Sequence, residues 1–236
     1  MHMENQARLK RLRATIRRPF AYLSPTWALA QVLKPEGDAD RRAAVIKALN
    51  AIYFRSSVVL FVVAAVSTLN DLSTLQPHGW RWWAILAQWL LMSRFFEVLS
   101  AFHRDALEKI TKADASKSSL SWVERVRLAL TSYLELIVDF ALIYALLPAS
   151  TWVSDDTPHP IAVTDLLWYS ANAITTSGGG GYIPLGLPLK VLTLCEILCG
   201  VVLLVVCFTI YTSPALGGDP NAPDVRQGAG SRSKEG

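Results

Sequence analysis

The feature of the sequence that most constrains its fold is a run of four glycines that leads into a long apolar segment. The glycines occupy positions 178–181, and the apolar segment at residues 187–211 is long enough to cross a bilayer. The residues before the glycines predict a short amphipathic helix whose N-terminus is capped by Thr164 or Asp165. Polyglycine bares its peptide oxygens, and irregular backbone at membrane depth persists only where protein or water surrounds it. The pattern therefore predicts a short helix and a loop that re-enter the membrane.

Composition places the chain among membrane proteins. Of its 236 residues, 52% are hydrophobic and only 18% are charged, which is more apolar than an ordinary soluble domain. Three further segments are apolar and about long enough to cross a membrane, at residues 51–69, 80–102 and 128–147. We therefore expect an all-α membrane protein with four transmembrane helices and the re-entrant helix and loop between the third and the fourth.

The distribution of lysine and arginine predicts how these helices are oriented. Basic residues are frequent in residues 1–19 and 103–127 and near the C-terminus, whereas residues 148–160 contain no Lys or Arg. By the positive-inside rule, both termini face the cytoplasm, and the loop enters a cell (inner) membrane from outside. Asp155 and Asp156 in the outer segment either concentrate cations at a pore mouth or are ordinary solvated surface.

The segments between and beyond the spans complete the predicted organisation. Residues 1–50 form a cytoplasmic basic and amphipathic segment, residues 51–102 hold the first two transmembrane helices, residues 103–127 are a cytoplasmic linker, and residues 214–236 are a disordered tail. Basic amphipathic helices bind anionic membrane lipids. Because membrane spans follow, we interpret the N-terminal segment as a membrane-surface helix, not a nucleic-acid-binding one. A solvated basic tail is the alternative.

Four ionisable residues lie within the predicted second and third spans, namely Arg94, Glu97, Glu135 and Asp139. Each costs about 2.5–3.5 kcal/mol to insert at the bilayer centre, so each should face protein or water. The arrangement of lowest free energy pairs Arg94 with one or more of the three acids. We expect this pairing to be a structural salt bridge, with a role in gating or proton sensing as the alternative.

Residues 175–184, TTSGGGGYIP, resemble the selectivity filter of potassium channels, in which TT is followed by V/I-G-Y-G-D and a nearby proline. A second pattern of prokaryotic two-transmembrane pore modules, L-G-R…E…G, is followed at Leu185-Gly186, Lys190, Glu196 and Gly200. The resemblance covers residues 127–213. It implies a pore domain at residues 128–213 with an outer helix, a pore helix, a filter and an inner helix.

The resemblance also implies roles for individual residues. The ion-conducting filter comprises Thr176, Ser177, Gly178, Gly179 and Gly180. Supporting side chains and backbone come from Trp168, Tyr169, Thr175, Gly181 and Tyr182. Gly200 in the inner helix is interpreted as a hinge or a point of close helix approach, with tolerated packing as the alternative.

The sequence departs from the potassium-channel filter at three positions. Ser177 replaces Val or Ile, Gly179 replaces Tyr and Gly181 replaces Asp. In the family, the Val and Tyr side chains point away from the pore and brace the filter. Gly179 leaves a void unless Trp168 or a neighbouring tyrosine fills it. A softer and wider filter is expected to discriminate weakly between potassium and sodium.

The expected function is passive conduction of a cation. One loop per chain cannot enclose an ion path, so we expect a homotetramer whose loop carbonyls replace the hydration shell of a monovalent cation, K⁺ by resemblance. No resident cofactor or metal, no nucleic-acid partner and no enzymatic activity are expected. The alternative is a non-conducting membrane scaffold or auxiliary subunit that retains the channel fold.

Overall fold

The computed structural model describes residues 24–34, 38–69, 82–110, 119–148, 151–154, 161–178 and 180–207. The elements in chain order are α3 (Pro25–Leu33), α4 (Ala39–Leu69), α5 (Trp82–Ile110), α6 (Trp122–Ala145), β1 (Trp152–Ser154), α7 (Val163–Ile174), β2 (Tyr182–Pro184), α8 (Leu187–Val201) and a π-helical continuation of α8, η2 (Val202–Cys207). The predicted N-terminal surface helix at residues 1–19, the acidic pair Asp155 and Asp156, and the C-terminal tail lie outside the described residues.

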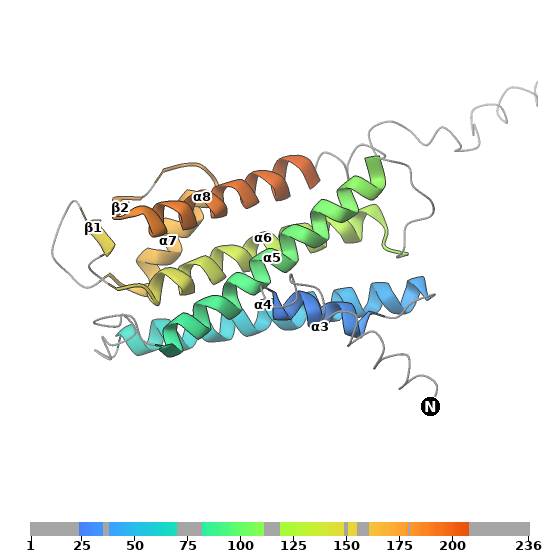
Figure 1. Ribbon diagram of the computed structural model, residues 1–236, viewed down its shortest axis with the longest axis horizontal. Helices are drawn as coiled ribbons and strands as arrows, with labels where there is room; N and C mark the ends of the chain where they lie inside the picture. Colours follow the sequence, from blue (N-terminus) through green and yellow to red (C-terminus); the bar gives the residue numbers. More distant parts are fainter. Residues whose placement is uncertain are drawn as a thin grey trace, which may run out of the picture.

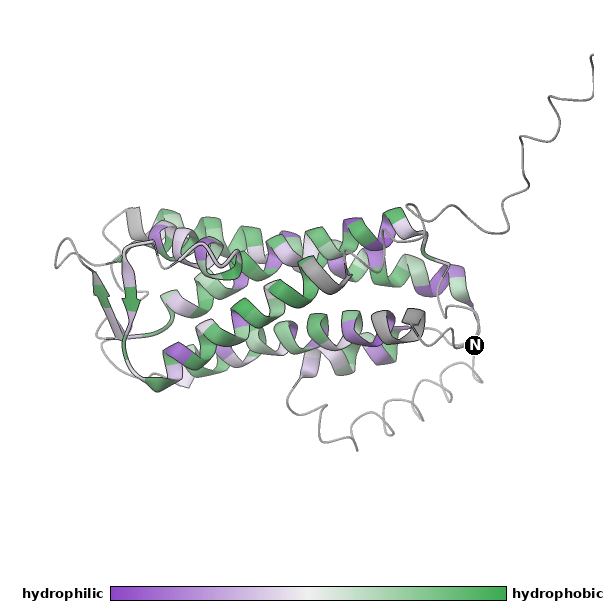
Figure 2. Cartoon of the chain, turned by 90° about the horizontal axis from the view of Figure 1, so that it is seen from above, coloured by the Kyte–Doolittle hydropathy of each residue, from purple (hydrophilic) through white to green (hydrophobic). Residues whose placement is uncertain are grey.

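Four of these helices, α4, α5, α6 and α8, are long and apolar enough to cross a membrane. They lie side by side in an elongated bundle, with green apolar residues along their outer surfaces (Figures 1 and 2). This confirms the prediction of a mostly helical chain with four candidate spans and fits a multi-pass integral membrane protein. Helix α6 is the centre of the bundle, because two-thirds of its span is buried against its neighbours α4, α5, α7 and α8.

The boundaries of the spans differ from the predicted ones for local reasons. Helix α4 runs unbroken from Ala39, because the segment that feeds the first span contains no proline or glycine. Helix α6 begins at Trp122, six residues before the predicted start. Ser121 caps it by accepting a hydrogen bond from the N–H of Glu124, and the Glu124 carboxylate accepts one from the N–H of Ser121. This reciprocal capping satisfies two terminal N–H groups and fixes where the helix starts.

Helix α7 is a short element between α6 and α8 (Figure 1). Its 12 residues reach about 18 Å, well short of the roughly 30 Å of a bilayer core. The predicted cap at Thr164 or Asp165 was wrong, because the N-cap is Ala162. Asp165 still helps to cap the helix from its first turn, where its carboxylate accepts a hydrogen bond of 3.1 Å from the Ala162 N–H.

A two-stranded antiparallel ribbon connects the segment that follows α6 with the segment that follows the glycine run. Strand β1 follows α6 and pairs with β2, which follows the glycine run, with Val153 opposite Ile183. The N–H of Leu185 also donates to the Thr151 carbonyl at 2.8 Å. The sequence analysis predicted no strands here. The ribbon ties the exit of the glycine-rich segment to the C-terminal end of α6.

Aromatic side chains pack the space between α6, α7 and the ribbon. Tyr144, Trp152 and Tyr169 form mutual edge-to-face contacts with ring centroids 4.8–5.4 Å apart, and Phe140 extends the cluster along α6. All four are buried. Edge-to-face pairs favour one relative orientation of the rings, so this cluster holds α7 at a fixed angle against α6.

Candidate functional site

The glycine-rich segment begins directly at the C-terminal end of α7 and is exposed in the single chain. Its backbone takes positive φ at Thr176, Gly178, Gly180 and Gly181, with values between 57° and 112°. Glycine adopts such angles without steric cost, whereas they are unusual for Thr176. Residues 175–178, 180 and 181 are all exposed, while the predicted filter residue Gly179 lies outside the described residues.

Hydrogen bonds fold the start of this segment back over the last turn of α7. The Thr176 N–H donates to the Ala173 carbonyl at 3.0 Å, and the Ser177 N–H donates to the Asn172 carbonyl at 2.8 Å. The Thr175 hydroxyl donates to the Ala171 carbonyl at 2.7 Å. These bonds satisfy the carbonyls at the end of the helix, so the chain turns sharply there.

The indole of Trp168 supports the far end of the glycine run. A Cβ atom placed on Gly180 would lie 2.8 Å from Cδ1 and Nε1 of Trp168, so only glycine fits against this ring. The Asn172 amide donates to the Trp168 carbonyl at 2.7 Å and holds the same turn of α7. The sequence analysis placed Trp168 among the supporting residues, and the structure brings it to Gly180. Tyr169 points instead into the aromatic cluster behind α7, and Tyr182 lies in β2.

A buried carboxylate, Glu196, joins the three helices of this half of the molecule. It is fully buried and accepts hydrogen bonds from the Tyr144 hydroxyl of α6 at 2.6 Å and from the Ser170 hydroxyl of α7. Thr193, one turn before Glu196 on α8, lies 3.0 Å from the Tyr169 hydroxyl. The sequence analysis named Glu196 only as part of a motif and missed Tyr144 and Ser170. A lone carboxylate within an apolar span was the signal that a partner should be sought.

Gly200 is the point of closest approach between α8 and α7. A Cβ atom there would lie 2.6 Å from both the carbonyl oxygen and Cγ1 of Ile174, the last residue of α7. This supports the interpretation of Gly200 as a site of close helix approach, and its role as a hinge stays a prediction. Immediately beyond it, the α-helix changes to the π-helical turn η2, a local irregularity of the kind frequent at functional sites.

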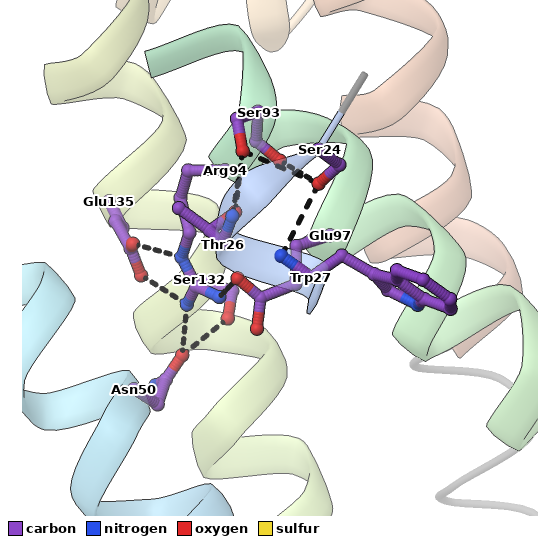
Figure 3. A network of polar contacts seen from close by, with 9 residues as sticks. All are labelled: Ser24, Thr26, Trp27, Asn50, Ser93, Arg94, Glu97, Ser132 and Glu135. Carbon is purple, nitrogen blue, oxygen red and sulfur yellow. Dashed lines mark hydrogen bonds and ion pairs between the residues drawn. The ribbon is translucent and has the colours of Figure 1, made fainter. Parts of the chain in front are cut away.

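The second polar cluster lies in the other half of the bundle and centres on Arg94 (Figure 3). Its guanidinium donates to both carboxylate oxygens of Glu135, at 2.6 and 3.0 Å, and to the Asn50 side-chain oxygen at 3.0 Å. Glu97 forms an ion pair with Arg94 at 3.1 Å. The prediction that Arg94 pairs with one or more of the three acids is confirmed, with Glu97 and Glu135 as its partners, and the four residues of the cluster are buried.

Asp139 does not join this cluster. It lies four residues beyond Glu135 on α6 and is 1% exposed. Ser57 of α4 lies beside it, but neither carboxylate oxygen has a hydrogen bond of ordinary geometry. Of the four charged residues predicted inside the spans, three therefore form one network, and Asp139 remains apart from it.

Helix α3 is anchored next to the Arg94 cluster. The Ser24 hydroxyl donates to the Ser93 carbonyl at 2.8 Å, and the Thr26 N–H donates to the Ser93 hydroxyl at 3.0 Å. Ser24 also caps α3 by accepting from the Trp27 N–H. Figure 3 shows these contacts on the side of α5 adjoining Arg94. The segment before the first span therefore packs on the bundle.

Comparison of the chain with protein-family models, with curated proteins and with solved structures returns no match.

Proposed function

We propose that the protein is a subunit of a potassium-channel-like cation channel that conducts passively through a tetrameric pore. The observation that carries the proposal is the segment from α7 to α8. A helix too short to span a membrane ends in a turn of exposed peptide groups, and a long apolar helix follows. In this proposal α6 is the outer helix, α7 the re-entrant pore helix, residues 176–180 the filter and α8 the inner helix.

The chemistry of the turn suits a cation. The C-terminal end of a helix carries a partial negative charge, and α7 ends where Thr175 and Thr176 begin the turn. Peptide carbonyls of Thr176, Ser177 and the following glycines then replace water around a permeating ion, which we take to be monovalent and K⁺ by resemblance. The charge pattern of the sequence places both termini on the cytoplasmic side, so the filter faces the outside.

The surface of α8 supports assembly with further copies. Leu187, Leu194 and Leu198 are 54–74% exposed and lie on one side of the helix with other apolar residues. A continuous apolar face on a single chain needs lipid or protein to cover it. In the proposed homotetramer, neighbouring subunits and membrane lipids cover this face, and four loops enclose the ion path that one loop cannot.

Weak discrimination between potassium and sodium follows from the small residues of the loop. Ser177 is exposed and contacts Thr175 of its own turn at 3.0 Å, so its side chain does not brace the loop against a neighbouring helix. Trp168 packs on Gly180 and replaces only part of the missing bulk. A loop held by one indole is more deformable than one braced at every residue.

The proposal is tested by recording from the purified full chain in planar bilayers under bi-ionic conditions. We expect currents whose reversal potential follows the cation gradient, with a permeability ratio of potassium to sodium far below that of a selective channel. Gly180→Val, which drives a branched side chain into Trp168, should abolish the current, while the exposed substitution Val59→Ala on α4 should leave it unchanged. A reversal potential that follows chloride contradicts the proposal. Purified tetramers that pass no current would favour the alternative function, a non-conducting membrane scaffold.

A further inference from the structure

A cavity of about 140 Å³ lies between α3, α4, α5 and α6, at the end of the bundle away from the β-ribbon. Its wall contains five cationic side chains, Lys34, Arg42, Arg94, Arg104 and Arg125. Among the residues that the structure describes, two acidic side chains, Glu97 and Asp105, line it. Among the described lining residues, cations therefore outnumber acids, and only Leu128 and Ser132 of α6 belong to the proposed pore domain.

The acidic residues of the wall already face cations. Glu97 forms an ion pair with Arg94, and Asp105 forms one with Arg125. Arg94, which is paired with Glu97 and Glu135, and Arg125, which is paired with Asp105, are each more than nine-tenths buried, so these ion pairs are fixed parts of the wall. Arg42, half-buried on α4, and Arg104, exposed on α5, add two positive charges to the wall.

Lys34 experiences the resulting positive potential. Burial lowers the pKa of its amine, and the nearby guanidiniums of Arg42, Arg94 and Arg104 lower it further, against an opposing effect of Glu97. Positive charge held at short range favours the approach of an anion. The cavity is too small for a drug-sized ligand, which needs roughly 300 Å³ or more, but has room for a single phosphate group.

We propose that this cavity binds a phosphate group, with Arg42 and Arg104 as residues that contact it. The cavity opens near the start of α4 and α6 and the end of α5, the region where the charge pattern places the cytoplasmic membrane surface. Basic pockets between transmembrane helices on that side suit the headgroups of anionic phospholipids. Apolar side chains of the same wall, among them Trp27, Phe102 and Leu128, offer contacts for the glycerol and upper acyl region. Free phosphate is the other source of the same group.

The experiment titrates the purified full chain, in a neutral detergent, with dioctanoyl phosphatidylglycerol, with dioctanoyl phosphatidylcholine and with inorganic phosphate. The melting temperature is followed by tryptophan fluorescence, because a ligand of the folded state raises it by an amount that grows with the logarithm of ligand concentration over Kd. The test variant is Arg42→Gln with Arg104→Gln. The matched control is Arg55→Gln with Arg127→Gln, which removes the same charge from exposed positions that do not line the cavity.

We expect phosphatidylglycerol to stabilise the wild type, phosphatidylcholine not to, and the test variant to bind phosphatidylglycerol about tenfold or more weakly. The control pair should retain the wild-type affinity within about twofold. Stabilisation by phosphatidylglycerol alone assigns the site to a lipid headgroup, and equal stabilisation by inorganic phosphate assigns it to the free anion.

Two results would overturn the proposal. One is an equal loss of affinity in the control pair, since binding would then reflect surface charge in general. The other is the absence of stabilisation by either phosphate-bearing probe. Should the double variant Arg42→Gln with Arg104→Gln fail to fold, the comparison is repeated with both positions changed to Met in a buffer that contains glycerol as a stabiliser. Arg42→Lys with Arg104→Lys, which keeps both charges, is measured beside it. The test does not depend on ion conduction, so its outcome is independent of the proposed channel activity.

Discussion

Two buried carboxylates, one in each half of the bundle, are held differently. Glu135 lies on α6 and contacts α5, whereas Glu196 lies on α8 and contacts α6 and α7. Glu135 accepts two hydrogen bonds from Arg94, so its charge is matched by a cation. Glu196 accepts hydrogen bonds from the hydroxyls of Tyr144 and Ser170, and no described Lys or Arg forms an ion pair with it. Both carboxylates are 0% exposed.

The difference distinguishes a rigid network around Arg94, the clamp, from an adjustable contact around Glu196. A paired ion network resists change, because removing either partner leaves an unmatched charge in an apolar setting. Hydroxyl donors are weaker and can be exchanged among neighbours such as Thr193. We therefore interpret the Arg94 network as the fixed framework of α4, α5 and α6, and the Glu196 network as the contact through which α8 and α7 adjust to each other.

The largest effect should follow from removing the cation of the clamp. Arg94→Met leaves the carboxylates of Glu97 and Glu135 without their cation and removes one of the two donors to the Asn50 oxygen, so we expect the free energy of unfolding to fall by about 3–5 kcal/mol. Unfolding of the purified protein in mixed detergent micelles measures this loss. Arg55→Gln, exposed on α4, serves as the control and should change stability by less than about 0.5 kcal/mol. A variant as stable as the wild type would show that the network is not a clamp.

Substitutions of Glu196 separate its charge from its shape. Glu196→Ala removes the acceptor that the Tyr144 and Ser170 hydroxyls share, leaving them the longer contact to Thr193 and the Ile137 carbonyl, and it opens a space, so we expect a loss of about 2–4 kcal/mol. Glu196→Gln keeps one acceptor oxygen and should cost only about 1 kcal/mol. The same unfolding measurement compares them. A glutamine variant as unstable as the alanine variant would mean that the hydroxyl network depends on the carboxylate itself, which removes the proposed contrast with Glu135.

The close approach of α8 to α7 should tolerate no added methyl group. Gly200→Ala places a Cβ atom at 2.6 Å from the Ile174 carbonyl oxygen, and overpacking of this kind costs about 1–3 kcal/mol. The gain in helix propensity, about 1 kcal/mol, offsets part of that cost. The control is Val201→Ala, at the next position, which is exposed. Both variants are measured by unfolding and by channel current. Unchanged stability and current would show that α7 and α8 separate easily.

The smallest effect is expected at the surface of the first half. Lys47 of α4 and Glu124 of α6 form an ion pair at 2.9 Å with both side chains more than a third exposed. Exposed pairs contribute about 0–1 kcal/mol and are screened by salt, so Lys47→Gln should lower the free energy of unfolding by less than about 1 kcal/mol, and added salt should shrink the difference from the wild type. A loss above about 1 kcal/mol would mean that peripheral charges, and not the Arg94 network, hold α4 to α6.

The framework could be predicted from the sequence largely because its signals are local. Apolar runs of fixed length predict spans, and a charged residue inside a span must find a partner, so Arg94 could be matched with one or more of Glu97, Glu135 and Asp139. The three candidate partners left the choice open, and only the packing of α4 against α6 places Asp139 outside the network.

The site of the second half was less predictable because its contacts connect distant residues. Tyr144 and Glu196 are 52 positions apart, and hydroxyl-bearing residues are too frequent in helices to indicate a partner. The strands β1 and β2 have three residues each and show no alternating pattern that would predict them. The cap of α7 was misplaced because Asp165 satisfies a terminal N–H from inside the helix, not from the capping position.

The central claim is that the exposed turn at residues 176–181 meets its counterparts from other chains around a common axis. A cryo-electron microscopy map of the purified full chain in lipid nanodiscs tests this most directly. The account predicts four chains with their turns converging on a fourfold axis and their α8 helices surrounding a cavity beneath it. A single-chain particle, or an assembly in which these turns face lipid away from the axis, would contradict it.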